Sequence, residues 1–140
     1  MALLVSGLGV FAGCGDSGPK MAPVEGTVSL DGKPLNNIMV EFWPSSAGPR
    51  SIAVSDAQGR YKLMADDGKR EGAAVGPHKV VLHDVSVYGE NPPVGRAAEN
   101  VDVTKGKKPR ISNKFASPET TTISQTVEDK KNDLNIDIPK

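Results

Sequence analysis

The chain carries few residues of the types that catalysis or metal binding requires. Its only histidines, His78 and His83, lie five residues apart in a run of alternating apolar and polar residues. On a β-strand their side chains would point to opposite faces, so they could not ligate one metal ion. A zinc site would also need cysteine or carboxylate ligands. A serine hydrolase of the nucleophile-elbow type would need Gly-x-Ser-x-Gly, which the sequence lacks. We therefore predict no catalytic residues and no metal, and that the protein is not an enzyme.

Cys14 is the only cysteine, and it follows an apolar N-terminal stretch. The stretch 1–13 is too short for a bilayer span, which takes about 20 residues, but it suits the apolar core of a signal peptide. Ala12 and Gly13 are the small residues that a signal peptidase needs beside its cleavage site. An unpaired cysteine in a secreted chain needs an explanation, and acylation supplies one. The alternative is an apolar N-terminal strand with a buried free thiol.

The sequence VFAGC at 10–14 resembles the lipobox of bacterial lipoproteins, with Phe11 where that family usually has Leu. The resemblance implies that 1–13 is a lipoprotein signal peptide and that Cys14 carries a covalent lipid, with palmitate among its acyl chains. It also implies that the protein is anchored to a membrane of the cell envelope, outside the cytoplasm. The Gly, Ser and Pro residues that follow indicate a flexible tether. We expect the lipidated cysteine and tether to occupy 14–22 and a folded domain to begin near Pro23.

The single tryptophan, Trp43, lies on the opposite face of its segment from Ile38, Val40 and Phe42. If those three residues belong to the core, Trp43 is exposed or is covered by a loop. An exposed tryptophan is a candidate contact for a sugar or a protein. Tyr88, near the end of the longest apolar run, allows the same two interpretations.

The segment 89–114 is long for a loop in a compact domain, and loops beyond about 15 residues are usually functional or disordered. Its excess of cations could contact anionic headgroups, envelope polysaccharide or an acidic protein partner; a solvated insertion is the alternative. The candidate binding residues are Trp43, Tyr88, Arg96, Lys105, Lys107, Lys108 and Arg110. Over the whole chain 17 Lys and Arg balance 17 Asp and Glu. We therefore expect no nucleic-acid partner, because phosphate binding needs a cationic footprint.

Alternation of apolar and polar residues dominates the rest of the chain and predicts β-strands with one buried face. The predicted strands are 24–30, 38–42, 52–54, 60–64, 77–87, 122–128 and 134–138. We expect 52–64 to form a hairpin around a turn at 56–59, and 129–132 to be a hairpin loop between the last two strands. The change of alternation at Asp84 predicts a bulge. Asp31 and Asp56 are typical turn residues; a calcium site there would need six or more oxygen ligands.

About seven short strands between Gly, Pro and Asx turns predict an all-β fold, a single antiparallel β-sandwich of prealbumin or immunoglobulin type. VEGTVSLDGKPL at 24–35, VEF at 40–42, SDAQGRYKL at 55–63 and GPHKV at 76–80 resemble the carboxypeptidase regulatory-like (transthyretin-like) domains of bacterial envelope lipoproteins. This resemblance implies a seven-stranded sandwich without a catalytic centre. The domain would occupy 23–140, with a long loop at 89–114.

Two functions remain open from the sequence. The first is a non-catalytic, membrane-anchored envelope lipoprotein that acts as a structural or protein-interaction module. The second is a carbohydrate-binding or solute-binding surface module that uses Trp43, Tyr88 and the basic loop. In both cases the covalent lipid on Cys14 is the only attached group that we expect.

Overall fold

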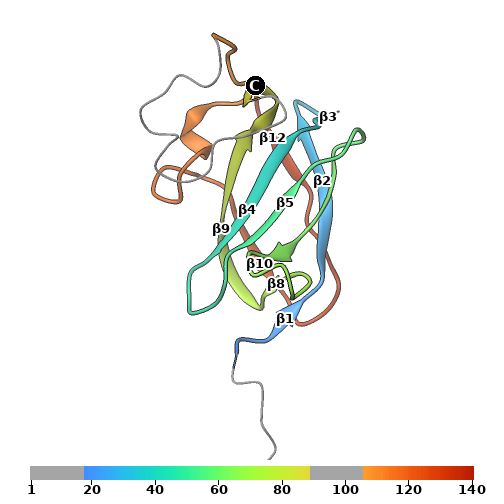
Figure 1. Ribbon diagram of the computed structural model, residues 1–140, viewed down its shortest axis with the longest axis vertical. Coiled ribbons are helices and arrows are strands. Elements are labelled where there is room, and N and C mark those ends of the chain that lie inside the picture. The colour runs from blue at the N-terminus through green and yellow to red at the C-terminus, as the bar shows by residue number, and fades with distance from the viewer. Residues whose placement is uncertain (1–17, 89–105) are drawn as a thin grey trace, which may run out of the picture.

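A computed structural model of the protein describes residues 18–88 and 106–140, and over these residues the chain forms the predicted all-β sandwich (Figure 1). The strands are β1 (Met21–Ala22), β2 (Val24–Leu30), β3 (Lys33–Pro34), β4 (Ile38–Pro44), β5 (Ser51–Val54), β6 (Arg60–Lys62), β7 (Met64–Ala65), β8 (Ala73–Ala74), β9 (Gly76–Asp84), β10 (Ser124–Val127), β11 (Asn132–Asp133) and β12 (Ile136–Ile138). Two 3-10 helices, η1 (Val85–Tyr88) and η3 (Asn113–Phe115), complete the described elements.

Two five-stranded sheets make the layers of the sandwich. One has the order β10-β9-β4-β5-β7, and the other joins β2 to β11, β12, β3 and β6. A short two-stranded sheet pairs β1 with β8. Most pairs are antiparallel as predicted, whereas β11 and β12 run parallel to β2.

The core lies between the sheets because alternate residues of each long strand are apolar. Ile38, Val40 and Phe42 of β4 are fully buried and face Val80 and Leu82 of β9 across the register. Burying one such side chain stabilises the fold by about 1.5–3 kcal/mol. The face of β4 that carries Ile38, Val40 and Phe42 is therefore buried, and Val80 and Leu82 mark the inner face of β9.

The predicted hairpin over 52–64 is wrong, because its second half divides between the sheets. The turn forms as expected: Asp56 Oδ1 accepts hydrogen bonds from the backbone N–H groups of Gln58 and Arg60, both at 2.9 Å. Beyond the turn, however, β6 pairs with β2, and only β7 returns to β5. Burial of Tyr61 fixes the crossing, since its hydroxyl donates to the Leu134 carbonyl on the β2 sheet.

The loop 129–132 likewise connects the two sheets rather than the strands of a hairpin. β10 pairs with β9, whereas β11 pairs with β2. Buried Asn132 holds the turn closed, because its Nδ2 donates to the carbonyls of Glu128 at 3.0 Å and Lys130 at 2.6 Å. A polar side chain that satisfies backbone groups in this way competes with strand pairing.

The predicted bulge at Asp84 is also wrong. β9 ends at Asp84, and the next four residues form η1 instead of extending the strand to Val87. The Asp84 carboxylate accepts from both the N–H and the hydroxyl of Ser86. This local capping turns the chain out of the sheet.

Strand pairing begins within the predicted tether 14–22. Met21 and Ala22 pair with Ala74 and Ala73, and the Lys20 carbonyl accepts from the N–H of Val75 at 2.8 Å. The C-terminal part of the predicted loop 89–114 is also structured. Its residue Ile111 is buried in the core cluster, next to η3.

The long strands connect two poles of the sandwich. Pro44 of β4 lies opposite His78 at one pole, where β1 begins, and Ile38 lies opposite Asp84 at the other (Figure 1). We name these the tether pole and the far pole. The chain leaves β1 toward its N-terminus at the tether pole, while η1 and the C-terminus lie at the far pole (Figure 1).

Candidate functional site

The outer face of the β10-β9-β4-β5-β7 sheet carries the exposed large apolar side chains of the described residues. Trp43 is 36% exposed, Val54 49% and Met64 36%. The register places Val54 opposite Met39, and Met64 opposite Ile52, so all of these side chains share one face. We call Met39, Ile52, Val54 and Met64 the apolar patch.

Sequence reasoning found Trp43 but not the apolar patch. The short strand 52–54 was predicted, yet alternation alone does not say which of its two faces is buried. The structure turns Ser51 and Ala53 inward, opposite Phe42 and Val40, and leaves Val54 outside. The signal that could have identified the patch is the run Ile-Ala-Val, in which the small Ala53 fits the core face.

Trp43 is held in place at the edge of this patch. Its indole Nε1 donates to Glu41 Oε2 at 2.8 Å. The guanidinium of Arg50 lies 5.2 Å from the ring centroid and also donates to the same Glu41 oxygen at 3.4 Å. Glu41 itself is buried, and its other oxygen lies 3.6 Å from His83 Nε2. The arrangement fixes the indole orientation without closing off the ring.

Beside Trp43 the surface forms a pocket of about 340 Å³. It is lined by Trp43, Pro44, Ser45, Lys79, Pro118 and Glu119. These residues come from the end of β4, from β9 and from the segment between η3 and β10. Lys79 lies directly opposite Trp43 in the strand register. The sequence did not reveal Lys79, Pro118 and Glu119 as neighbours of Trp43, because only strand pairing brings them together.

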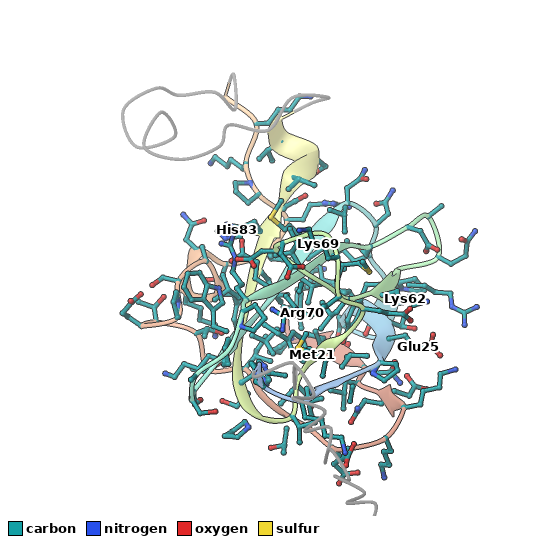
Figure 2. All side chains as sticks on the ribbon, turned by 60° about the horizontal axis from the view of Figure 1, so that its bottom comes forward. Met21, Glu25, Lys62, Lys69, Arg70 and His83 are labelled. Atoms are coloured by element: carbon teal, nitrogen blue, oxygen red, sulfur yellow. The ribbon has the colours of Figure 1, made fainter. Side chains whose placement is uncertain are left out.

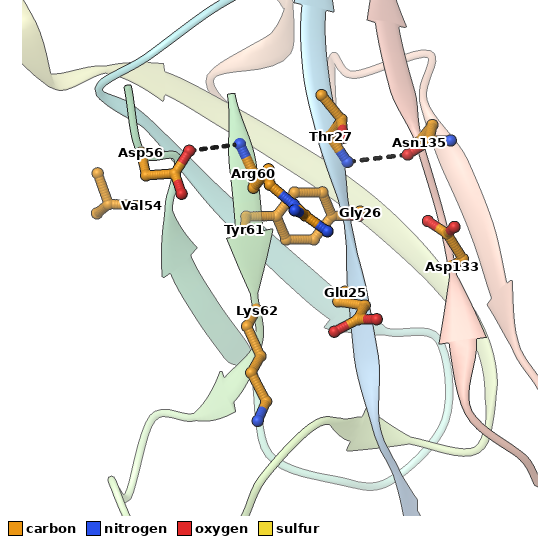
Figure 3. Close-up of a pocket in the computed structure, with 10 residues that line it drawn as sticks. All are labelled: Glu25, Gly26, Thr27, Val54, Asp56, Arg60, Tyr61, Lys62, Asp133 and Asn135. Atoms are coloured by element: carbon orange, nitrogen blue, oxygen red, sulfur yellow. Dashed lines mark hydrogen bonds between the residues drawn. The ribbon is translucent and has the colours of Figure 1, made fainter. Parts of the chain in front are cut away.

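A larger and more polar groove of about 640 Å³ lies mainly over the other sheet and reaches Val54 of β5 (Figure 3). Two of its charged side chains form ion pairs with residues outside the groove, Glu25 with Lys131 and Lys62 with Glu71. Glu25 receives a hydrogen bond from Lys131 at 2.8 Å, which lowers the pKa of Glu25. The Asn135 side chain accepts from the N–H of Thr27 at 2.9 Å. Glu25 and Lys62 lie side by side on this face (Figure 2).

Arg110, a predicted binding residue, is engaged in an internal ion pair. Its Nη2 lies 2.8 Å from Asp84 Oδ1, and its Nε donates to Asp84 Oδ2 at 2.9 Å. Nη2 also donates to the Asn36 carbonyl at 2.7 Å. Burial alone would raise the pKa of Asp84, but the hydrogen bonds from Arg110 and Ser86 outweigh it and lower the pKa to about 2. The guanidinium thus ties the segment after 89–105 to the end of β9.

Of the other predicted binding residues, some lie within the described chain and some lie outside it. Lys107 and Lys108 are exposed, next to Arg110. Arg96, Lys105, Cys14 and the side chain of Tyr88 lie outside the described residues. Arg110 binds Asp84 at the end of β9, whereas Trp43 lies opposite Lys79 on the same strand. Asp84 and Lys79 are five residues apart, which is about 17 Å at the rise of an extended strand. The structure therefore does not bring Trp43 and Arg110 into one site.

The two histidines lie on opposite faces of β9, as predicted. His83 is on the outer face near Glu41, whereas His78 is buried against Phe42, with ring centroids 5.6 Å apart. His78 Nδ1 donates to the Gly76 carbonyl at 2.9 Å, and burial lowers the pKa of this imidazole. Within 18–88 and 106–140, no three His, Cys, Asp or Glu side chains are grouped so that they could hold a metal ion.

The tether pole carries mixed charges around the first described residues. Lys20 forms an ion pair with Asp129 at 2.5 Å, and Met21 and Arg70 lie near each other in Figure 2. In the part of the chain that the structure describes, no helix is long and apolar enough to cross a membrane.

Comparison with known proteins yields little. No protein-family model matches the chain, and no curated protein matches it. Among solved structures it is similar to chlorocatechol 1,2-dioxygenase from Pseudomonas putida, at 16% identity and a TM-score of 0.38. The similarity covers 87% of this chain and 60% of the dioxygenase, so the chain spans less than two thirds of that protein's length. A likeness this distant supports no inference about fold or activity.

Proposed function

We propose that this protein is a non-catalytic, lipid-anchored lipoprotein of the cell envelope whose sandwich acts as a protein-interaction module. The observation that supports an interaction role is the apolar patch. Exposed apolar side chains gathered on one sheet face are typical of protein contact sites, whereas scattered ones are not. Val54 and Met64 are exposed side by side with Met39 and Ile52, on neighbouring strands.

The composition of the patch fits a protein partner. Its members are aliphatic or thioether side chains, which offer no hydrogen bonds, and methionine adapts to different partner shapes. Charged groups border it: Arg50 lies 3.8 Å from Asp66, and Glu71 lies 2.6 Å from Lys62. An apolar centre with a polar rim is the usual anatomy of a protein interface.

The lipoprotein part of the proposal rests on the sequence of the first 14 residues and on the resemblance to carboxypeptidase regulatory-like domains. The described part of the chain begins at the tether pole, next to β1 (Figure 1). A membrane attached through Cys14 would then lie on the side of the tether pole. The exposed Lys107 and Lys108 precede Arg110, which binds Asp84 at the far pole.

Capture of crosslinked partners tests the interaction surface. In intact cells, crosslinking followed by mild-detergent purification and mass spectrometry is expected to recover a stoichiometric protein partner. Val54→Asp places a charge in the patch, and we expect it to reduce recovery about tenfold or more, the effect of losing roughly 1.4 kcal/mol of binding free energy. Because Val54 is half exposed, the fold should be affected by less than about 1 kcal/mol.

Thr126→Asp is the matched control for this experiment. Thr126 is exposed on β10, at the opposite edge of the same sheet. The same new charge there should leave partner recovery unchanged. If no protein partner is recovered, or if Val54→Asp and Thr126→Asp behave alike, the apolar patch is not the interaction surface.

The anchor has its own test. Protein purified from its native envelope is expected to begin at Cys14 and to carry added acyl mass in intact-protein mass spectrometry. Cys14→Ser removes the acylated sulfur and should yield a form that is unprocessed or is released from the membrane fraction. A mature protein with an unmodified Met1 would refute the anchor while leaving the interaction surface unaffected.

A further inference from the structure

The pocket beside Trp43 is a hollow open to solvent, and one of its sides is an indole ring in a fixed orientation. Trp43 cannot turn freely, because Glu41 accepts its Nε1–H at 2.8 Å and Arg50 stacks 5.2 Å from the ring centroid. Pro44 and Pro118 contribute rigid walls. A volume of about 340 Å³ is at the small end of the usual range for ligand sites, roughly 300–1,000 Å³. A fixed aromatic wall binds with little loss of conformational entropy.

The polar groups at the rim are one cation and one anion. Lys79 supplies N–H donors, and Glu119 supplies carboxylate acceptors. The Ser117 hydroxyl donates to Glu119, and this bond, together with the nearby charge of Lys79, lowers the pKa of the Glu119 carboxyl. The rim therefore carries no net charge, and it offers a donor and an acceptor at the same time.

We propose that the Trp43 pocket binds one ring of a neutral carbohydrate. The face of an indole is electron-rich and attracts the weakly positive C–H groups that one side of a pyranose ring presents. A sugar hydroxyl both donates and accepts, so neighbouring hydroxyls can accept from Lys79 and donate to Glu119. An anionic ligand would be repelled by the Glu119 carboxylate, and a cationic one by the Lys79 ammonium. Charge complementarity thus selects a neutral, hydroxyl-rich ligand.

This site goes beyond the proposed protein-interaction role and does not depend on it. Trp43 lies opposite Lys79 on β9, whereas the apolar patch lies over β4, β5 and β7. A sugar ring in the pocket would leave Val54 and Met64 uncovered. The carbohydrate test uses purified protein alone, so its failure is distinguishable from a failure to capture a partner.

Intrinsic fluorescence gives a direct readout, because Trp43 is the only tryptophan in the chain. The probes are methyl β-D-glucopyranoside, methyl α-D-mannopyranoside, N-acetylglucosamine, maltotriose, cellotriose and chitotriose, each titrated into the millimolar range. We expect a saturable change in Trp43 emission with at least one of them. The full chain with Cys14→Ser is suitable, because no step of the test needs the lipid.

Variants of the rim connect the signal to the pocket. Lys79→Ala and Glu119→Ala retain Trp43, and each is expected to weaken binding about tenfold, the loss of one charge-assisted hydrogen bond. Lys62→Ala removes an exposed cation from the other sheet and should leave the titration unchanged. Far-UV circular dichroism checks that each variant is folded.

Three results would overturn the proposal. One is the absence of a saturable response to every neutral saccharide. Another is a response that Lys79→Ala and Glu119→Ala leave unaltered, which would place the sugar elsewhere. The third is saturation by a proline-rich peptide or by glucuronate at concentrations tenfold lower than any neutral sugar requires, which would assign the pocket to a peptide or an anion.

Discussion

Replacing Gly26 with alanine is expected to destabilise the protein more than most single substitutions, by about 3 kcal/mol or more. A Cβ atom at this position would lie 2.2 Å from the carbonyl oxygen of Leu134 and 2.7 Å from its carbonyl carbon. Both atoms belong to the backbone between β11 and β12, which cannot move without breaking the parallel pairing of these strands with β2. Equilibrium urea unfolding, followed by circular dichroism, measures the loss.

Gly68→Ala is the matched control for steric contact. Gly68 has a φ of 67°, but nothing lies within 4 Å of the Cβ position. Its substitution should cost only the backbone strain of a left-handed residue, about 1–2 kcal/mol. If Gly26→Ala costs no more than Gly68→Ala, the close approach of β2 to the Leu134 carbonyl does not limit the sequence at this position.

Asp84→Asn is expected to cost about 3 kcal/mol, through loss of the ion pair with Arg110. The Asp84 side chain is fully buried, and its two oxygens accept five hydrogen bonds, from Ser86 and Arg110. An amide of the same shape keeps the volume but removes the charge and one acceptor. Because the Arg110 side chain is 34% exposed, water offsets part of the loss, and we expect the lower end of the range for broken buried pairs.

The same substitution should change how stability depends on pH. The pKa of Asp84 is about 2 in the folded protein, against about 3.9 in an unfolded chain. A depressed carboxyl pKa contributes stability that is fully present above about pH 4 and is lost as the pH falls through about 2. Unfolding free energies measured from pH 5 to pH 2 should therefore fall less steeply in Asp84→Asn than in the natural protein.

Asp129→Asn is the control for the fall of the unfolding free energy at low pH. Asp129 pairs with Lys20, but both side chains are more than half exposed. An exposed pair contributes less than about 1 kcal/mol. Equal slopes for Asp84→Asn and the natural protein between pH 4 and pH 2 would show that Asp84 does not carry the acid dependence.

The Asp84–Arg110 pair also changes the interpretation of the basic residues. The sequence groups Arg110 with Lys107 and Lys108, as neighbouring cations that could bind a partner. In the structure its guanidinium binds a buried carboxylate and the Asn36 carbonyl. Nothing local to either residue indicates this pairing, because Asp84 and Arg110 are 26 positions apart and meet only when the chain returns to the end of β9.

Strand existence and inner faces were predictable wherever one face of a strand is buried. In β2 and β4 the alternation of apolar and polar residues identified the core positions, such as Val28 and Val40. The turn at Asp56 was predictable for a different reason, since its side chain bonds backbone groups two and four residues away. Both signals are local, so they can be read from neighbouring residues.

Strand partners were not predictable in this way. The segments 60–65 and 129–133 have the polarity of ordinary hairpins, but both cross from one sheet to the other. The choice depends on where Tyr61 and Asn132 find partners for their polar groups, and those partners, the carbonyls of Leu134 and Pro23, are distant in sequence.

The candidate sites, too, have some features that the sequence predicts and others that depend on contacts between distant residues. Three features follow from the residue pattern alone: Trp43 points away from the core, His78 and His83 face opposite sides of one strand, and the fold is an all-β sandwich. Two others became visible only in three dimensions: Val54 and Met64 lie exposed together, and Lys79 and Glu119 flank Trp43. The direction of a side chain follows from the period of its own strand, whereas its neighbours follow from strand register and sheet order, which depend on contacts across the whole chain.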